Sequence, residues 1–224
     1  MIENSSEGPI LTISERETRL WSKAAMLDLG ERLIIILLFA HFAYINISVF
    51  EQIFDIKALL LLISECLPVF LVLIRKASGD VSVRPLDWAF GFAGTAFPLL
   101  VTPTMVGSPL LPAPILYVVI ALGQCLQIYA KMYLGTSFGI VAANRGVKQL
   151  GPYRFVRHPM YAGYVLTQIA LLLALPSLRN AAFYSLALVC HVVRIECEER
   201  VLRRDATYRA FAERVRYRMV PGIF

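Results

Sequence analysis

The residues best suited to chemistry lie in two short polar runs in the second half of the chain. The first run is GPYRFVRHPMYAG, residues 151–163. Gly151-Pro152 is typical of a turn, and Pro159 suits the first turn of a helix. Because the start of a helix presents free backbone N–H groups, the run could hold a carboxylate ligand. The alternative is a loop on a membrane surface, with Arg154 and Arg157 against lipid phosphates.

The second run is RIECEERVL, residues 194–202. Arg194 and Glu198 are four residues apart, so a helix would place them on one face, and Glu199 follows directly. Charged residues near the end of a membrane helix usually face protein or water and mark function. A guanidinium suits a carboxylate or phosphate on an acceptor, and a glutamate could act as the base for an amine. The alternative is a plain ion pair at the membrane interface.

The tail that follows, LRRDATYRAFAERVRYRMVP, alternates apolar residues with arginines. The apolar residues recur at spacings of three, four and six, at Leu202, Tyr208, Phe211, Val215 and Met219. This spacing predicts an amphipathic C-terminal helix on the inner membrane surface.

The elements that must position these residues are membrane helices. Apolar residues make up 58% of the chain, against about 45–50% in soluble domains, and the mean hydropathy is +0.64. A span needs about 20 apolar residues. The sequence therefore predicts an all-α integral membrane protein of about six transmembrane helices, at 33–50, 58–74, 86–105, 113–133, 160–175 and 181–197.

The basic residues predict the orientation. Of the 22 Lys and Arg residues, all but Lys57 and Arg179 fall in segments that share one side of this map. The positive-inside rule places that side in the cytoplasm. We therefore expect a multi-pass protein of the inner or cytoplasmic membrane, if prokaryotic, with both termini and the 134–159 loop in the cytoplasm. The net charge of +6 belongs to these segments, so no nucleic acid partner is expected.

The chain offers no clear metal site. Its four cysteines have no CxxC spacing, so neither a disulfide framework nor a zinc site is expected. His41, His191 and Glu65 lie within apolar runs. We interpret them as partners in hydrogen bonds between helices, and Glu65 as the costliest to bury.

Two patterns together, GPYxxxRHPxY and RxxxEExxL, resemble the isoprenylcysteine carboxyl methyltransferase family over about residues 130–221. The hydropathy and charge map predicts a cytoplasmic N-terminal segment at 1–32 and transmembrane helices at 33–130, and the resemblance adds a cofactor-binding region with a helical hairpin and tail at 131–224. The resemblance implies S-adenosyl-L-methionine as cofactor and a role for Arg194 in placing the acceptor carboxylate, and we expect Arg194 and Glu199 to be the catalytic residues. The implied cofactor-binding residues are Arg145, Gly146, Val147, Lys148, Tyr153, His158, Pro159, Met160, Tyr161 and Glu198.

The implied activity is methyl transfer to a lipophilic or small acceptor with a carboxylate, thiol or amine. Many enzymes of the family carry His-x-Leu-Val where this chain has Arg145–Lys148, so the acceptor stays open. The alternatives are a phospholipid N-methyltransferase, an NADPH-dependent membrane reductase of the sterol-reductase type, and a membrane protein without catalytic activity. Membrane lipids are expected partners, and the oligomeric state is open.

Overall fold

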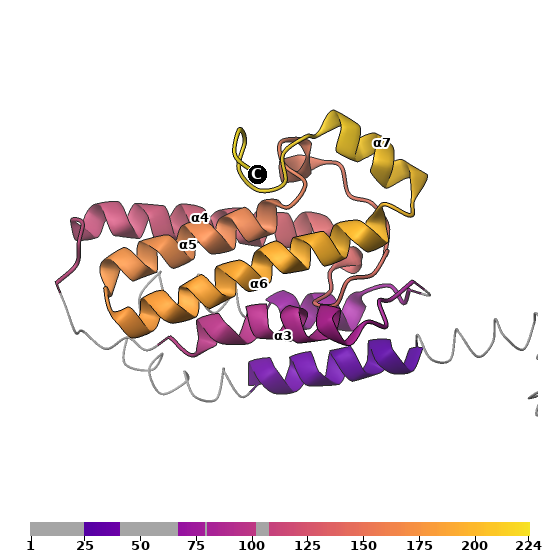
Figure 1. Cartoon of the computed structure of the whole chain (residues 1–224), viewed down its shortest axis with the longest axis horizontal. Coiled ribbons are helices and arrows are strands. Elements are labelled where there is room, and N and C mark those ends of the chain that lie inside the picture. The colour runs from indigo at the N-terminus through magenta and orange to yellow at the C-terminus, as the bar shows by residue number, and fades with distance from the viewer. Residues whose placement is uncertain (1–24, 41–66, 79, 102–107) are drawn as a thin grey trace, which may run out of the picture.

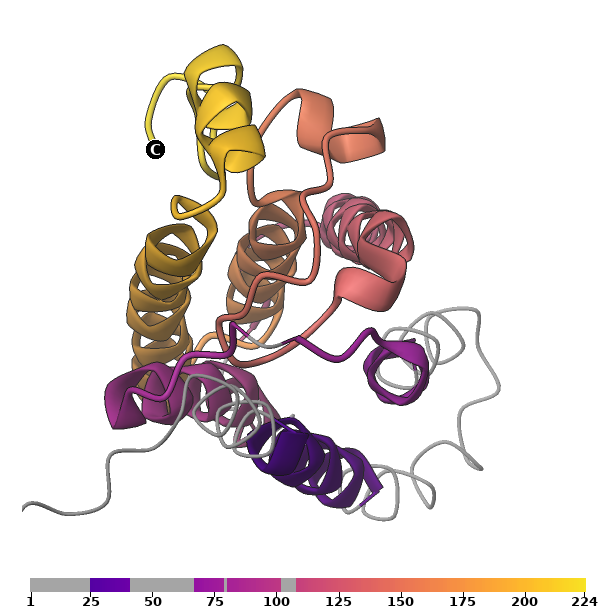
Figure 2. The ribbon, with the colours of Figure 1, turned by 90° about the vertical axis from the view of Figure 1, so that its right-hand side faces the viewer.

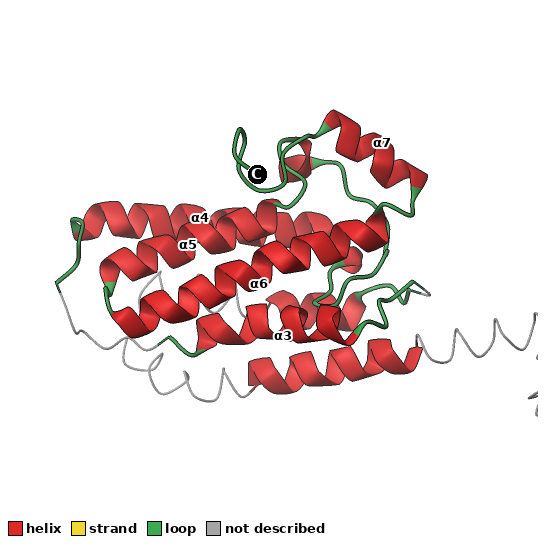
Figure 3. Ribbon diagram, in the orientation of Figure 1, coloured by secondary structure: helices red, strands yellow, loops and turns green. Residues whose placement is uncertain are grey.

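The computed structural model describes residues 25–40, 67–78, 80–101 and 108–224, and these ranges are helical and contain no β-strand (Figures 1 and 3). Two helical segments at 25–40 and 67–74 come first. They are followed by α3 (Pro85–Leu99), α4 (Ala113–Leu134), α5 (Pro159–Ala174), α6 (Leu178–Leu202) and α7 (Ala206–Arg214). Two short 3-10 turns, Gly135–Ser137 and Gly151–Arg154, lie between α4 and α5.

Local sequence explains where these helices begin. Proline stands in the first turn of α3, α4 and α5, where its missing N–H costs no hydrogen bond. The Ser177 side chain accepts a hydrogen bond from the backbone N–H of Asn180 and caps α6. Asp205 caps α7 in the same way, since its carboxylate accepts from the N–H of Thr207 at 2.8 Å. Both are favoured N-cap residues.

The long helices pack closely where small residues face each other. α4 packs along α5, and α3 packs along α6. A Cβ atom on Gly163 of α5 would lie 2.7 Å from the backbone nitrogen of Gln127 in α4, and one on Gly123 would lie 3.0 Å from the Gly163 carbonyl oxygen. Membrane helices often approach through such small residues. This contact brings the polar side chains of α4 and α5 into one interior.

The connections that the sequence places in the cytoplasm meet at one end of the bundle. Figure 2 views the helices nearly end-on and shows the segment between α4 and α5 crossing that end. Its backbone is tied to the loop before α3 by hydrogen bonds from Ser82 N to Ala142 O and from Lys76 N to Thr136 O, both 2.9 Å. This long loop packs into the protein, because its residues Phe138, Ile140, Val141, Tyr153 and Val156 are buried. Phe155 is instead exposed.

The expected spans are confirmed only in part. Within the described ranges one helix, Ala113–Ser137, is long and apolar enough to cross a membrane, and α5 is a shorter apolar helix. The expected spans at 33–50 and 58–74 lie largely outside the described residues, as do His41 and Glu65. The third was expected to reach residue 105, but α3 ends at Leu99, just after Pro98. The sixth continues past its expected end to Leu202.

The structure corrects the prediction for the tail. One long amphipathic helix was expected, but α7 has nine residues and the chain beyond it is not helical. Tyr208, Phe211, Val215 and Met219 are buried in the protein core. The apolar stripe therefore packs on the protein and not on lipid.

The expected boundaries at 32 and 131 do not coincide with breaks in the fold. Residues 25–32 belong to the helical segment 25–40, and Glu31 within them is fully buried. Residue 131 lies inside α4. The described part of the chain therefore gives no sign of separate units at these positions.

Candidate active site

A cavity lies at the end of the bundle where the loops meet. It holds about 690 Å³, including space open to solvent, between the α4–α5 loop, the start of α5, the end of α6 and α7. Nine of the expected cofactor-binding residues line it: Arg145, Gly146, Val147, Lys148, Tyr153, His158, Met160, Tyr161 and Glu198. Pro159 does not line it and serves as the first residue of α5. The sequence pattern therefore identified most of one wall.

The tail forms a second wall, through residues that were not among the expected cofactor-binding residues. Tyr208 and Phe211 of α7 line the cavity together with Arg157 and Leu202. The two aromatic residues had been assigned to a lipid-facing stripe. Their apolar spacing could not have shown this, because burial on protein and burial in lipid produce the same spacing. The signal that could have found them is their position in the tail that completes the family pattern.

Backbone hydrogen bonds hold the start of α5 against the tail. The N–H of His158 donates to the carbonyl of Arg218 at 2.7 Å, and the N–H of Arg157 donates to that of Tyr217 at 3.0 Å. The His158 ring lies between two carboxylates, with Nδ1 3.7 Å from Glu198 and Nε2 3.3 Å from Glu199. The ring is thus fixed at the cavity wall.

Glu199 lies outside the cavity and is enclosed by cations. Its carboxylate accepts a hydrogen bond from Arg157 Nε at 2.7 Å and one from Arg203 at 3.0 Å, and Arg218 Nε lies 3.4 Å away. Glu199 follows residue 197, where the sixth expected span ends, so its carboxylate lies outside that expected span. Burial alone would raise its pKa, but hydrogen bonds from His158, Arg157 and Arg203 outweigh burial and lower the pKa well below 4.5. A carboxylate held ionised in this way anchors the tail and is a poor proton acceptor.

A second cavity lies between the helices. It holds about 800 Å³ on the same measure, and its lining combines polar side chains with a larger apolar surface. The polar part includes Gln124 and Gln127 of α4, Thr167 and Gln168 of α5, and His191 and Arg194 of α6. The apolar part includes Phe39, Pro68, Pro98, Leu99, Leu171 and Tyr184. Arg194, expected to place the acceptor, thus faces a different cavity from the expected cofactor residues.

Three side chains separate the two cavities. Tyr161 Oη donates a short hydrogen bond to Glu198, and both residues line the loop cavity. Arg194 Nε lies 3.7 Å from the same carboxylate, and its guanidinium lies 5.3 Å from the centre of the Tyr161 ring. The expected placement of Arg194 and Glu198 on one helix face is confirmed. We call Tyr161, Glu198 and Arg194 the partition.

The loop cavity suits S-adenosylmethionine in its chemistry. The Glu198 carboxylate suits an ammonium or ribose hydroxyl, and the rings of Tyr153, Tyr208 and Phe211 suit a planar base. No cluster of metal-binding residues occurs in the part of the chain that the structure describes.

Comparison with known proteins finds a similar family and a similar solved structure. Residues 115–204 match the model of the isoprenylcysteine carboxyl methyltransferase (ICMT) family. One solved structure, described as the eukaryotic intramembrane Ras methyltransferase ICMT without a monobody, shares 17% identity over 95% of this chain and 88% of its own, with a TM-score of 0.47. No curated protein matches the chain. The matched segment contains most of α4, all of α5 and α6 and the whole partition, and over this part the chain resembles the isoprenylcysteine carboxyl methyltransferase family.

Proposed function

We propose that this membrane methyltransferase binds S-adenosylmethionine in the loop cavity and an amphiphilic carboxylate in the cavity between the helices. The observation that carries the proposal is the partition, because Tyr161 and Glu198 line one cavity while Arg194 lines the other. A methyl donor and its acceptor would meet there from opposite sides.

Each residue has a definite task in this arrangement. S-adenosylmethionine, when bound, supplies a methyl group already activated by its sulfonium. Glu198 would orient the cofactor through its ammonium or hydroxyl groups, and Tyr161 holds that carboxylate in place. His158 closes the wall beside it. The protein's contribution is alignment and the exclusion of water.

The contacts of Arg194 favour an anionic acceptor. Its guanidinium is buried, and its hydrogen bonds to Gly91 O, Thr95 Oγ1 and Gly139 O are 3.4–3.5 Å long, at the limit for such bonds. Its Nε finds no hydrogen-bond partner among the described residues. A carboxylate could satisfy this planar fork far better. The apolar part of the cavity lining suits a lipophilic body, in keeping with the isoprenylcysteine carboxyl group of the family's name.

The same geometry disfavours an amine acceptor. A carboxylate is already a nucleophile, whereas a protonated amine must first lose a proton to a base. Glu199 is held by arginines, and Glu198 already accepts from Tyr161. Phospholipid N-methylation is therefore the second candidate.

We also propose six spans with the loop cavity facing the cytoplasm. The segments rich in Lys and Arg meet around that cavity, as shown by the hydrogen bond between Asn144 and Asp205 at 3.1 Å and the ion pair between Asp80 and Arg204 at 2.8 Å. A cofactor made in the cytoplasm would then reach its cavity directly, and the acceptor would come from within the bilayer.

The proposal can be tested with the purified chain in lipid nanodiscs. Calorimetry with S-adenosylhomocysteine tests the cofactor, with NADPH as the competing ligand. Transfer of a radiolabelled methyl group is then measured to an S-prenyl cysteine derivative, to the same compound with its carboxyl group converted to an amide, to phosphatidylethanolamine and to a small thiol. We expect binding of S-adenosylhomocysteine and transfer to the free carboxylate alone. Binding of NADPH instead would refute the function, and transfer to the amine or thiol with an inert carboxylate would refute the acceptor.

A further inference from the structure

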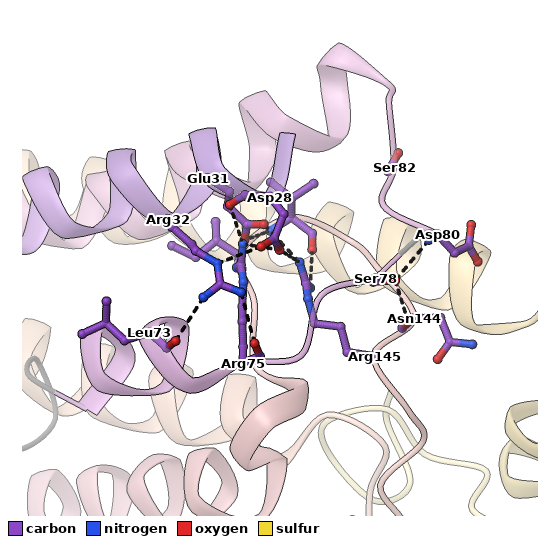
Figure 4. A network of polar contacts seen from close by, with 12 residues as sticks. Asp28, Glu31, Arg32, Leu73, Arg75, Ser78, Asp80, Ser82, Asn144 and Arg145 are labelled. Carbon is purple, nitrogen blue, oxygen red and sulfur yellow. Dashed lines mark hydrogen bonds and ion pairs between the residues drawn. The ribbon is translucent and has the colours of Figure 1, made fainter. Parts of the chain in front are cut away.

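The first helical segment, residues 25–40, carries two buried acids that the proposed function does not use. Asp28 and Glu31 are 5% and 0% exposed. Both point into a cluster of three arginines, the neighbouring Arg32 and the distant Arg75 and Arg145 (Figure 4). A buried acid is costly unless it is paired, so the contacts of this cluster show what it holds together.

Glu31 holds the backbone of the α4–α5 loop. Its Oε1 atom accepts hydrogen bonds from the N–H groups of Ile140 and Val141, at 2.7 and 2.9 Å. Its Oε2 atom accepts from the Arg145 guanidinium at 3.2 Å. One carboxylate therefore binds this loop at three points, more than a hundred residues away in sequence.

Asp28 and Arg75 hold Glu31 in turn. Arg75 lies 2.9 Å from Glu31 and 2.7 Å from Asp28. Arg32 pairs with Asp28 at 2.7 Å and donates to the carbonyls of Leu73 and Arg75. The end of the second helical segment is thereby fixed to the first, and Glu31 has little freedom to move.

The loop that Glu31 holds lies between both cavities. Val141 and Arg145 line the loop cavity, while the carbonyl of Gly139 accepts from Arg194, which lines the other. The Arg145 guanidinium lies so close over Gly139 that a Cβ atom there would be 2.3 Å from it. A shift of residues 140–145 would therefore displace the part of the cofactor wall that Val141 and Arg145 form.

We propose that Glu31 is a positioning residue of the cofactor site: from the first helical segment it fixes the backbone at residues 140–145 and so sets the wall that receives the cofactor. The inference rests on the proposed function, since it takes the loop cavity as the cofactor site. It gives the N-terminal helices, which lie outside the segment matched to the family, a part in binding the cofactor. Glu31 acts through the loop and does not line the cavity itself.

The test uses two variants of the full chain, Glu31→Gln and Glu31→Ala. Glutamine keeps an oxygen that can accept from Ile140 and Val141 but lacks the charge that attracts Arg145. Alanine removes both. We expect the Kd for S-adenosylhomocysteine to rise about tenfold in Glu31→Ala, equal to about 1.4 kcal/mol, and less in Glu31→Gln. At saturating cofactor, kcat and the acceptor KM should stay within about threefold of the parent, under 1 kcal/mol on the same conversion.

Asp87→Asn is the matched control. Asp87 is an equally buried carboxylate on α3, bonded to Ser82 and Arg200 and not to residues 139–145. It should lower the thermal midpoint and leave the cofactor Kd unchanged. If Glu31→Ala does not fold, the test rests on Glu31→Gln, which must still raise the Kd for S-adenosylhomocysteine above that of the parent.

Three results separate the possibilities. A parent protein that does not bind S-adenosylhomocysteine overturns the proposed function and this inference with it. A parent that binds, with both Glu31 variants binding equally well, overturns the inference alone. A third result is that Kd and the acceptor KM rise while kcat and the thermal midpoint fall in parallel, as for a general loss of structure. This would show that Glu31 only stabilises the fold and would also overturn the inference.

Discussion

Replacing Glu199 by glutamine should detach the tail from the bundle. The carboxylate is 1% exposed and joins α6 to Arg157 before α5 and to Arg218 in the tail. Arg157 in turn donates to the carbonyls of Val215 and Arg216 at 2.8 and 2.6 Å. Glutamine has nearly the same shape, so the change removes charge and one acceptor while leaving the packing intact.

The size of the effect follows from these contacts. A hydrogen bond to a charged group contributes about 1.5–3 kcal/mol, and the buried Arg157 contact at 2.7 Å should lie in this range. The Arg203 side chain is 52% exposed, so its pair adds under about 1 kcal/mol. Because glutamine can still accept one bond from Arg157, we expect a loss of about 2–3 kcal/mol, or a drop of about 5–10 °C in Tm at this chain length.

The measurement is thermal unfolding of the purified protein in detergent, with Glu196→Gln as the control. Glu196 lies on the same helix and pairs with Arg218 at 2.6 Å, but its side chain is 50% exposed, so its loss should cost under about 1 kcal/mol. Equal midpoints for the two variants would refute the reasoning, because the burial of Glu199 would then contribute nothing.

The effect should also depend on pH. Burial raises the pKa of Glu199, but hydrogen bonds from His158, Arg157 and Arg203 outweigh burial and hold it below the ordinary value of 4.5. A carboxylate with a lowered pKa in the folded state stabilises the fold above its unfolded pKa, and this stabilisation is lost as the pH falls from there toward the folded value. The difference between parent and Glu199→Gln should be full at pH 7 and shrink below about pH 4.5.

Three further predictions concern the partition, the packing and the topology. Arg194→Ala should abolish transfer to the acceptor while the Kd for S-adenosylhomocysteine stays near that of the parent. Glu198→Ala should raise that Kd at least tenfold. Arg194→Lys should restore little transfer, because a point charge lacks the planar fork of donors. Parent-like binding and turnover in both alanine variants would reduce the pair to a structural role. Gly163→Ala, whose Cβ would lie 2.7 Å from Gln127 N, should lose about 1–3 kcal/mol of stability, whereas Gly30→Ala, with no atom within 4 Å, should lose none. Cysteine probes near Lys57 and Arg179 should react from outside and probes near Arg84 and Lys148 from inside; a probe at Lys148 labelled from outside would refute the topology.

The family resemblance supplied most of the expected residues of the loop cavity, and short-range patterns explain how some of them are positioned. The i, i+4 spacing of Arg194 and Glu198 fixes one helix face, and Pro159 fixes the start of α5. These are local rules, and the structure follows them. The glycine at 163 is also readable as a small residue in an apolar helix, although its partner on α4 is not.

The features missed by the sequence depend on contacts that no local spacing encodes. An apolar stripe in α7 looks the same whether it packs on lipid or on the cavity wall, so Tyr208 and Phe211 were assigned to the membrane. Glu31 falls in the segment 1–32, which hydropathy and the basic residues placed in the cytoplasm without indicating any contact with the rest of the chain. Its burial follows from pairing with Arg75 and Arg145, and such pairing becomes visible only in three dimensions.

The sharing of one carboxylate across the partition limits how kinetic data can be interpreted. Glu198 accepts from Tyr161 on the cofactor side and faces Arg194 on the acceptor side at 3.7 Å. An anionic acceptor that drew Arg194 away would leave the Glu198 carboxylate with Tyr161 as its hydrogen-bond donor. Because the positive charge of Arg194 would then be farther from Glu198, the carboxylate would attract a cationic group in the loop cavity more strongly. By linkage, cofactor binding must then favour acceptor binding by the same factor. A change in acceptor KM therefore does not by itself assign a residue to the acceptor cavity, and only separate binding measurements for each ligand can divide the roles of Arg194 and Glu198.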